Sequence, residues 1–408
     1  MGSAYRLFYD RPLHLVRGEG VWLYDAEGNK YLDMYNNVPH VGHCHPRVVD
    51  AICQQAGALN THTRYLHDNV VDLAERLTAK LPTDLDTAMF CCTGSEANEL
   101  ALRIARKVTD GAGIVVTSFS YHGNTQATYE VSTESIADAE LPDYVVTVPA
   151  PDCYRGPHHG DDAAEKYAAH VHDALDRLRR RDIRPAAFLI DTIVSSSGVV
   201  APPPGYLGRV AEIVRDAGAV FIADEVQPGF GRTGKHFWGF EVDDFVPDIV
   251  TTGKPMGNGH PISSVVTRRD LADAFARHSG YFNTFGGNPV SCAAALAVLD
   301  VLEEEKLQQN ALTVGRHLVA GLWKLAERYD CIGDVRGNGL FIAVEFVASR
   351  DKRTPATDFV RRLVNDLRER GLLTGAIGPD KNILKLRPPL ALTKDDADYA
   401  LNILEDTL

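Results

Sequence analysis

Two apolar segments of this chain end in side chains that can do chemistry. The segment Val220–Asp224 ends in a carboxylate, and further on Asp248–Thr252 is followed by a glycine and Lys254. Strand-end residues of an open α/β sheet lie at the edge where such sheets bind ligands. Lys254 lies between an apolar strand and a glycine-rich turn, and this context does not suit an ordinary solvent-exposed lysine. Once its amine loses a proton, it can attack an aldehyde and form a Schiff base.

A third segment is suited to binding phosphate. The residues Thr93–Asn98 lie between an apolar strand and an amphipathic helix, and Gly94 permits the tight turn between them. The free amides at such a helix start can bind a phosphate, although an ordinary capped helix has the same pattern. Together with Lys254 and Asp224, this turn points to one cofactor, pyridoxal 5'-phosphate.

The middle of the chain supplies the elements that must position these residues. Short runs rich in Val, Ile and Phe alternate with amphipathic stretches, which predicts a mostly parallel sheet covered on both faces. The expected strands are Ala88–Cys92, Ile114–Ser118, Ala187–Ile193, Val220–Asp224, Asp248–Thr252 and Ser263–Thr267, and the expected helices include Ser95–Val108 and Val210–Asp216.

The two ends of the chain differ from the middle. A hairpin signal at Ala26–Asn29 separates two short strands near the N-terminus, and helices dominate after about Val290. Further strands are expected at Gly339–Phe346 and Ile383–Leu386. We therefore expect a large central domain over residues 51–289, with segments 1–50 and 290–408 forming a smaller α+β domain.

The composition excludes several classes of protein. The chain has 408 residues, and its 42 Lys and Arg against 55 Asp and Glu give a net charge of −13, which disfavours a nucleic-acid partner. No apolar run reaches membrane-spanning length, and no metal-binding spacing of His or Cys occurs. The seven cysteines are scattered, which is typical of reduced thiols, so we expect a cytoplasmic location.

Motifs along most of the chain resemble one enzyme family. Asp224–Gln227, Gly229–Gly234, Pro247–Val250 and Gly253–Lys254 are similar in type and order to the signature of class III aminotransferases. These are pyridoxal-phosphate enzymes with the aspartate-aminotransferase fold, fold type I. The resemblance implies a large, mostly parallel sheet domain, and a smaller α+β domain made from both termini.

The resemblance also implies roles for individual residues. Lys254 would bind the cofactor aldehyde as a Schiff base and then carry protons during catalysis. Asp224 would pair with the pyridine nitrogen of the cofactor. Val226 would pack on one face of the ring and Tyr121 would stack on the other.

The remaining implied contacts surround the ring hydroxyl and the phosphate. Gln227 would bond the hydroxyl, Gly94 and Ser95 would hold the phosphate, and His122 is assigned to the same cofactor site. Thr284 matches a threonine that reaches the phosphate of the neighbouring subunit's cofactor. The resemblance thus implies a homodimer with shared active sites.

The pattern departs from the family where many members bind their keto acid. A glutamate there holds aside an arginine that later grips a carboxylate, and these two positions correspond to Ser196 and Lys385, with Arg387 close by. Gating by a glutamate–arginine pair at these positions is therefore doubtful. Arg336 lies in another family motif, where a structural role and a substrate contact are both open.

One branch of the family also lacks this glutamate and arginine. It contains the phospho-lyases acting on phosphoethanolamine and 5-phosphohydroxylysine. The stretches that resemble it are Asn36–Val38, Arg64–Asn69, Cys153–Gly156, Gly253–Pro261 and Arg353–Thr357. Cationic groups for a leaving phosphate would be Arg64 and Lys385, although these could equally be structural charges. Arg387 is assigned to substrate binding together with them. Phe90–Thr93 and His122–Thr128 depart from this branch.

Three functions therefore stay open. The first expectation is an aminotransferase that moves an amino group from a primary amine or amino acid to a keto acid or aldehyde. The alternative is a phospho-lyase that eliminates phosphate and ammonia from an O-phosphorylated amino alcohol. A non-catalytic pyridoxal-phosphate-binding module is a third, but binding alone would not require both Lys254 and Asp224.

Overall fold

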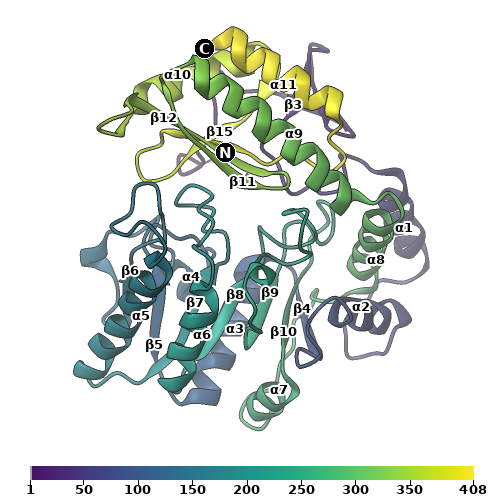
Figure 1. Ribbon diagram of the computed structural model, residues 1–408. Helices are drawn as coiled ribbons and strands as arrows, with labels where there is room; N and C mark the ends of the chain where they lie inside the picture. The colour runs from purple at the N-terminus through teal and green to yellow at the C-terminus, as the bar shows by residue number, and fades with distance from the viewer. Residues whose placement is uncertain (1) are drawn as a thin grey trace. The chain divides into compact units, whose positions relative to one another are not determined.

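The computed structural model describes residues 2–408 and divides the chain into two compact units (Figure 1). The first contains the residues up to His45, Gly231–Lys235 and Leu302–Leu408, and the second contains Pro46–Phe230 and His236–Val301. We expected the divisions at 50/51 and 289/290. They fall at 45/46 and 301/302 because helices α1 (Pro46–Ala58) and most of α8 (Pro289–Glu304) belong to the second unit.

The second unit is built on a sheet of seven strands. Their order is β4 (Thr87–Cys91), β10 (Ser263–Thr267), β9 (Ile249–Thr252), β8 (Val220–Asp224), β7 (Pro185–Asp191), β5 (Gly113–Thr117) and β6 (Val145–Val148). The neighbouring pairs from β9 to β6 are parallel, as predicted. Strand β10 is the exception in the predicted mostly parallel sheet, because it is antiparallel to both β4 and β9. No helix joins β9 to β10, and so short a link cannot make a parallel crossover.

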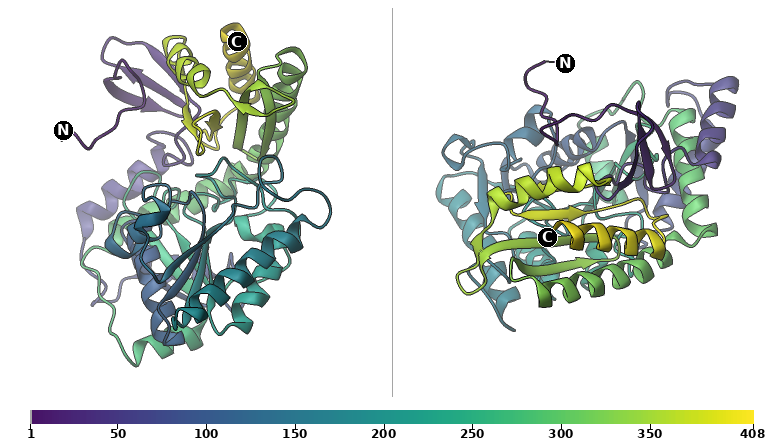
Figure 2. Two further views of the ribbon diagram at one scale, coloured as in Figure 1. Left: turned by 90° about the vertical axis from the view of Figure 1, so that its left-hand side faces the viewer. Right: turned by 90° about the horizontal axis from the view of Figure 1, so that it is seen from above.

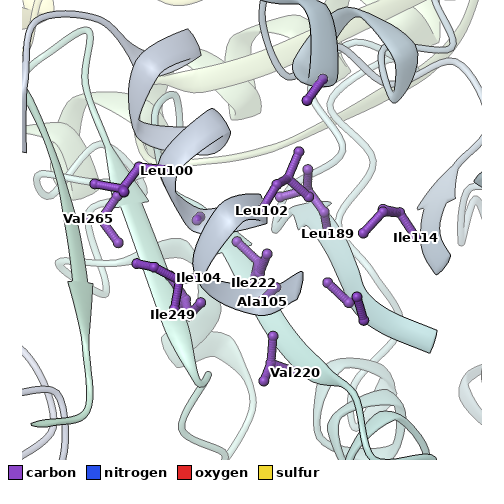
Figure 3. Close-up of a cluster of buried hydrophobic side chains, with 14 of the residues drawn as sticks. Leu100, Leu102, Ile104, Ala105, Ile114, Leu189, Val220, Ile222, Ile249 and Val265 are labelled. Atoms are coloured by element: carbon purple, nitrogen blue, oxygen red, sulfur yellow. The ribbon is translucent and has the colours of Figure 1, made fainter. Parts of the chain in front are cut away.

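Helices cover this sheet because each has one apolar face. In Figure 1, α5 (Ala163–Arg180) and α6 (Tyr206–Asp216) lie in front of the sheet and α3 (Gly94–Thr109) lies behind it. Figure 3 shows Leu100 and Ile104 of α3 beside Ile222, Ile249 and Val265 of the strands. This packing fixes the start of α3 at the carboxyl edge of the sheet. The other helices of this unit are α2 (Asp68–Thr78), α4 (Gln126–Glu130) and α7 (Arg269–Ala276).

The first unit joins both ends of the chain, as the predicted fold class requires. Strand β3 (Lys30–Asp33) pairs in parallel with β14 (Leu372–Leu373), beside β1 (Leu15–Glu19) and β2 (Trp22–Asp25). Figure 2 shows these N-terminal strands beside the C-terminal helices. A second sheet contains β11 (Ile332–Asn338), β12 (Phe341–Ser349), β16 (Ile383–Leu386) and β15 (Gly375–Ile377), with β13 (Thr354–Pro355) paired to β12. The helices of this unit are α9 (Leu307–Arg328), α10 (Thr357–Glu369) and α11 (Lys394–Thr407).

Arg336 has a structural role within this second sheet. Its Nη1 atom donates to Asp334 Oδ2 at 2.7 Å and to Glu345 Oε2 at 2.8 Å, and Glu345 is fully buried on β12. A buried carboxylate needs such a partner, so Arg336 neutralises Glu345 between two paired strands. Among the described residues, no helix is both long and apolar enough to cross a membrane.

Candidate active site

A pocket of about 290 Å³ opens at the carboxyl edge of the large sheet. Its lining includes all the predicted cofactor residues except Thr284, and adds Thr93, Asn98, Gly123, Asn124 and Asp191. The lining residues come from the β4–α3 turn, the loop after β5 and the ends of β7, β8 and β9. The fold therefore brings together groups that the sequence spreads from position 93 to position 254.

The β4–α3 turn forms one end of the pocket. Thr93 caps α3, because its hydroxyl accepts from Glu96 N at 3.2 Å while the Glu96 carboxylate accepts from Thr93 N. The first amides of the helix, at Gly94 and Ser95, lack intrahelical partners and can bind an anion. A Cβ atom on Gly94 would lie 2.8 Å from Val226 Cγ1, so only glycine fits there without displacing Val226.

The loop after β5 closes over the same turn. Gly123 has a φ of +146°, which favours glycine, and a Cβ atom there would lie 2.7 Å from Ser95 Oγ. Ser95 Oγ accepts a hydrogen bond from Asn124 N at 3.1 Å. Tyr121 lies in this loop and keeps 40% of its surface exposed, and burial of the rest raises the pKa of its hydroxyl. Tyr121 therefore lines the pocket while part of its surface stays exposed.

Asp224 is the buried acid at the end of β8. Its Oδ2 atom accepts from His122 Nδ1 at 2.7 Å and from Asn98 Nδ2 at 2.8 Å, and its Oδ1 atom accepts from Val226 N at 3.1 Å. Because a carboxylate only accepts, the proton in the first bond belongs to His122 Nδ1. These donors hold a negative charge at the bottom of the pocket.

A second buried carboxyl lies beside Asp224. Asp191 ends β7 and is the Cα partner of Asp224 in the parallel pairing of β7 with β8. Burial, and then the charge of Asp224, raise the pKa of Asp191. Ser195 donates to Asp191 Oδ2 through its hydroxyl at 2.5 Å and its amide at 3.0 Å. This carboxyl lines the pocket but was not among the predicted site residues.

Lys254 reaches the pocket directly after β9. Gly253 precedes it, and a Cβ atom on Gly253 would lie 3.2 Å from Val226 Cγ1 and 3.4 Å from Gly94 Cα. Gly94, Val226 and Gly253 therefore pack tightly into an apolar floor, with the half-buried Lys254 at its edge.

The groups in this pocket fit pyridoxal phosphate. A helix start suits its phosphate, a buried carboxylate suits its protonated ring nitrogen, and an amine suits its aldehyde. Val226 and Tyr121 offer an apolar side chain and an aromatic ring for the two faces of a flat ligand, and both line the cavity.

Comparison with known proteins agrees with this geometry. A family model described as aminotransferase class-III matches residues 8–408. The chain belongs to the class III aminotransferase family. Like other members of this family, it is a pyridoxal-phosphate-dependent enzyme with fold type I.

Three relatives of this class III chain carry two kinds of name. An alanine–glyoxylate aminotransferase 2-like protein of Drosophila melanogaster is 44% identical, over 98% of this chain and 83% of its own length. An ethanolamine-phosphate phospho-lyase homolog of Caenorhabditis elegans is 40% identical, over 100% and 91%. A solved phospholyase from Arthrobacter in complex with phosphoethanolamine has a TM-score of 0.96 and 45% identity, over 100% of this chain and 96% of that one.

Glu225, next to Asp224 in this class III chain, points into the protein core. It is fully buried and accepts hydrogen bonds from Thr192 Oγ1 at 2.7 Å, Gly239 N at 2.6 Å and Phe240 N at 2.9 Å. Burial raises its pKa to about 8. Of the two adjacent acids, Asp224 therefore lines the cofactor pocket, whereas Glu225 binds the backbone amides of residues 239 and 240.

The predicted substrate and partner residues are not among those that line this pocket. Arg64 is exposed, with its guanidinium 4.1 Å from the centre of the Phe282 ring, and Thr284 lies on the same exposed loop as Phe282. Lys385 and Arg387 belong to the first unit, where both are buried and Arg387 Nε donates to the carbonyl of Tyr35. These residues were assigned from a resemblance, and their roles stay predictions.

Proposed function

We propose that this enzyme is a phospho-lyase acting on a small O-phosphorylated amino alcohol of the phosphoethanolamine type. The observation that carries the proposal is its likeness, along the whole chain, to a phospholyase solved with phosphoethanolamine, at 45% identity and a TM-score of 0.96. The overall conversion takes the phosphorylated amine and water to an aldehyde, ammonia and inorganic phosphate.

The lost gating pair supports this choice. A transaminase must bind an amine and then a keto acid in one site, and many family members do so with a releasable arginine. Ser196 and Lys385 occupy the two positions of that device, and Ser196 carries no charge to hold an arginine aside. A lyase binds only one substrate and needs no such exchange.

The proposed roles of this chain's residues follow from the pocket. Pyridoxal phosphate, when bound, supplies an electron sink for the carbon next to the substrate amine. Lys254 would hold the cofactor through Nζ and then take the proton from that carbon. Asp224 Oδ1 would hold the proton on the ring nitrogen. The start of α3, with Gly94 and Ser95, would bind the cofactor phosphate, and Gln227 the ring hydroxyl.

The deciding experiment separates elimination from amino transfer. The purified holoenzyme is incubated with phosphoethanolamine without any keto acid, and phosphate, ammonia and aldehyde are assayed together. We expect the three products in equal amounts over many turnovers. Absence of phosphate release would contradict the lyase proposal.

Transamination is the second candidate, favoured by the 44% identical relative that is named as an aminotransferase. In the same experiment, alanine or a simple primary amine would convert the bound cofactor to its amine form in a single turnover, and pyruvate would reverse the change. That result, without phosphate release from phosphoethanolamine, would establish the aminotransferase in place of the lyase.

We also propose that the enzyme is a homodimer, with Thr284 at the interface. Loop residues 62–66 lie against residues 282–287, since the rings of His62 and Phe282 are 5.8 Å apart and a Cβ on Gly287 would lie 3.0 Å from Thr63 Cγ2. This surface exposes a group of large apolar side chains: Tyr65, Leu66 (96% exposed), Phe282 and Phe285. Such a patch is typical of a protein interface.

A charge placed in this patch tests the dimer. Light scattering on the wild type should give twice the chain mass, and Phe285→Asp should shift the population toward the chain mass because it buries an unpaired charge. Val242→Asp, at another exposed apolar residue of the second unit, is the control and should remain dimeric. A monomeric wild type, or an unaffected Phe285→Asp variant, would contradict the proposal.

A further inference from the structure

A buried chain of hydrogen bonds lies behind Asp224 and is not used by the chemistry described above. Thr251 Oγ1 donates to Asn98 Oδ1 at 2.6 Å, and Asn98 Nδ2 donates to Asp224 Oδ2 and to the carbonyl of His122, both at 2.8 Å. Each of these four residues is at most 4% exposed. These hydrogen bonds connect helix α3 to strands β8 and β9 and to the loop after β5.

The direction of each bond in this chain is fixed by chemistry. The carboxylate of Asp224 and the carbonyl of His122 can only accept, so the NH₂ group of Asn98 must face them. The Asn98 oxygen then faces Thr251, and the hydroxyl of Thr251 must donate to it. Thr251 thereby holds the amide in the one orientation that presents two donors to the pocket side.

The backbone pairing explains why these side chains meet. Asp224 is the Cα partner of Asp191 on β7 and of Thr251 on β9, so the three residues form one row across parallel strands. In-register neighbours of parallel strands project to the same face of the sheet. Asn98 on α3 lies over this row and contacts two of its members.

The hydrogen bonds are unevenly divided between the two carboxylate oxygens. Oδ2 accepts from His122 and from Asn98, whereas within residues 2–408 Oδ1 accepts from the amide of Val226 alone. Each oxygen of a carboxylate can accept about two hydrogen bonds. Oδ2 is therefore fully used, and Oδ1 keeps one acceptor position for the ring nitrogen of the cofactor.

We propose that Asn98 and Thr251 are positioning residues that orient the Asp224 carboxylate so that Oδ1 accepts a hydrogen bond from the protonated ring nitrogen of the cofactor. The inference rests on the proposed role of Asp224 and extends it to two residues that do not touch the reacting atoms. Two titratable side chains of the described residues lie beside Asp224, His122 from the loop after β5 and Asp191 from β7, and the changes at positions 98 and 251 leave both side chains in place.

Adjacent threonines of β9 provide a matched test. Thr251→Val keeps the shape of the side chain but removes the hydroxyl that orients Asn98. Thr252→Val removes an equally buried hydroxyl, which bonds Ser264 Oγ at 2.8 Å and has no bond to Asp224 or Asn98 among the described residues. Asn98→Leu removes both donors in a side chain of similar size.

For the holoenzymes, we expect kcat to fall about 10-fold in Thr251→Val, which loses the neutral hydrogen bond that orients Asn98. We expect a fall of roughly 100-fold in Asn98→Leu, which also loses the charge-assisted bond to Asp224, with little change in KM in either variant. The pH midpoint of the cofactor's visible absorbance should shift in both variants and not in Thr252→Val. Cofactor release, followed by dialysis and fluorescence, should be faster in the first two variants only. Circular dichroism and the melting temperature confirm that each variant is folded.

Each outcome bears on the proposal. If Thr251→Val and Thr252→Val have the same kcat, absorbance midpoint and cofactor release, Asn98 is only a structural residue and the inference is overturned. If Asn98→Leu does not fold, the comparison of Thr251→Val with Thr252→Val still tests the proposal. If Asp224→Asn keeps full activity, the proposed role of Asp224 fails first, and this result is distinct from a failure at Thr251.

Discussion

Lys254→Ala is expected to lower turnover by about 10⁴-fold or more, because the variant loses the amine that holds the cofactor and the base that moves the substrate proton. The expectation rests on the position of Lys254 at the edge of the floor formed by Gly94, Val226 and Gly253. Measured kcat with phosphoethanolamine checks the effect. Borohydride reduction followed by peptide mass analysis should locate the cofactor on the peptide containing residue 254 in the wild type, and on no peptide of the variant.

An exposed lysine serves as the control for this change. Lys107→Ala, near the end of α3, should leave both the activity and the cofactor-bearing peptide unaltered. Retained turnover in Lys254→Ala, or a cofactor attached to a different lysine, would show that the chemistry lies elsewhere.

Asp224→Asn is expected to lower kcat by roughly 10³-fold, since an amide cannot hold a proton on the ring nitrogen as a carboxylate does. The change also replaces the charged acceptor of His122 Nδ1 and Asn98 Nδ2 with a group of mixed donor and acceptor character. Steady-state kinetics and the absorbance of the bound cofactor are the measurements, and Asp224→Glu tests whether a displaced charge restores part of the rate.

A second buried aspartate allows a matched comparison. Asp248, just before β9, is 2% exposed and pairs with Arg215 and Arg268 at the opposite end of the strand from Lys254. Asp248→Asn should lower the melting temperature through loss of these ion pairs while the folded enzyme keeps its kcat. Equal kinetic losses in the two variants would mean that Asp224 acts through stability alone.

The pattern of apolar residues correctly predicted several elements at the cofactor pocket. Strands β8 and β10 have the bounds that the apolar runs predicted, and α3 differs from its predicted bounds by one residue at each end. These apolar runs are continuous and bounded by turn residues, so the strands that they predict are the strands that become buried in the sheet. The short strand β6 and the edge strand β11 were not predicted, and the apolar pattern left the antiparallel direction of β10 open because strand direction is set by connections and pairing.

The sequence by itself determined the cofactor, the family and the strand-end positions of Asp224 and Lys254, because the end of an apolar strand can be read from the order of residues. Tertiary structure alone decided that Asn98, Thr251 and Asp191 surround Asp224, since these contacts join a helix and three strands distant in the chain. It also decided that Glu225 turns to the core while its neighbour faces the pocket. Side chains that meet only through the packing of separate elements leave no local pattern, and their hydrogen bonds exist only once the sheet has formed.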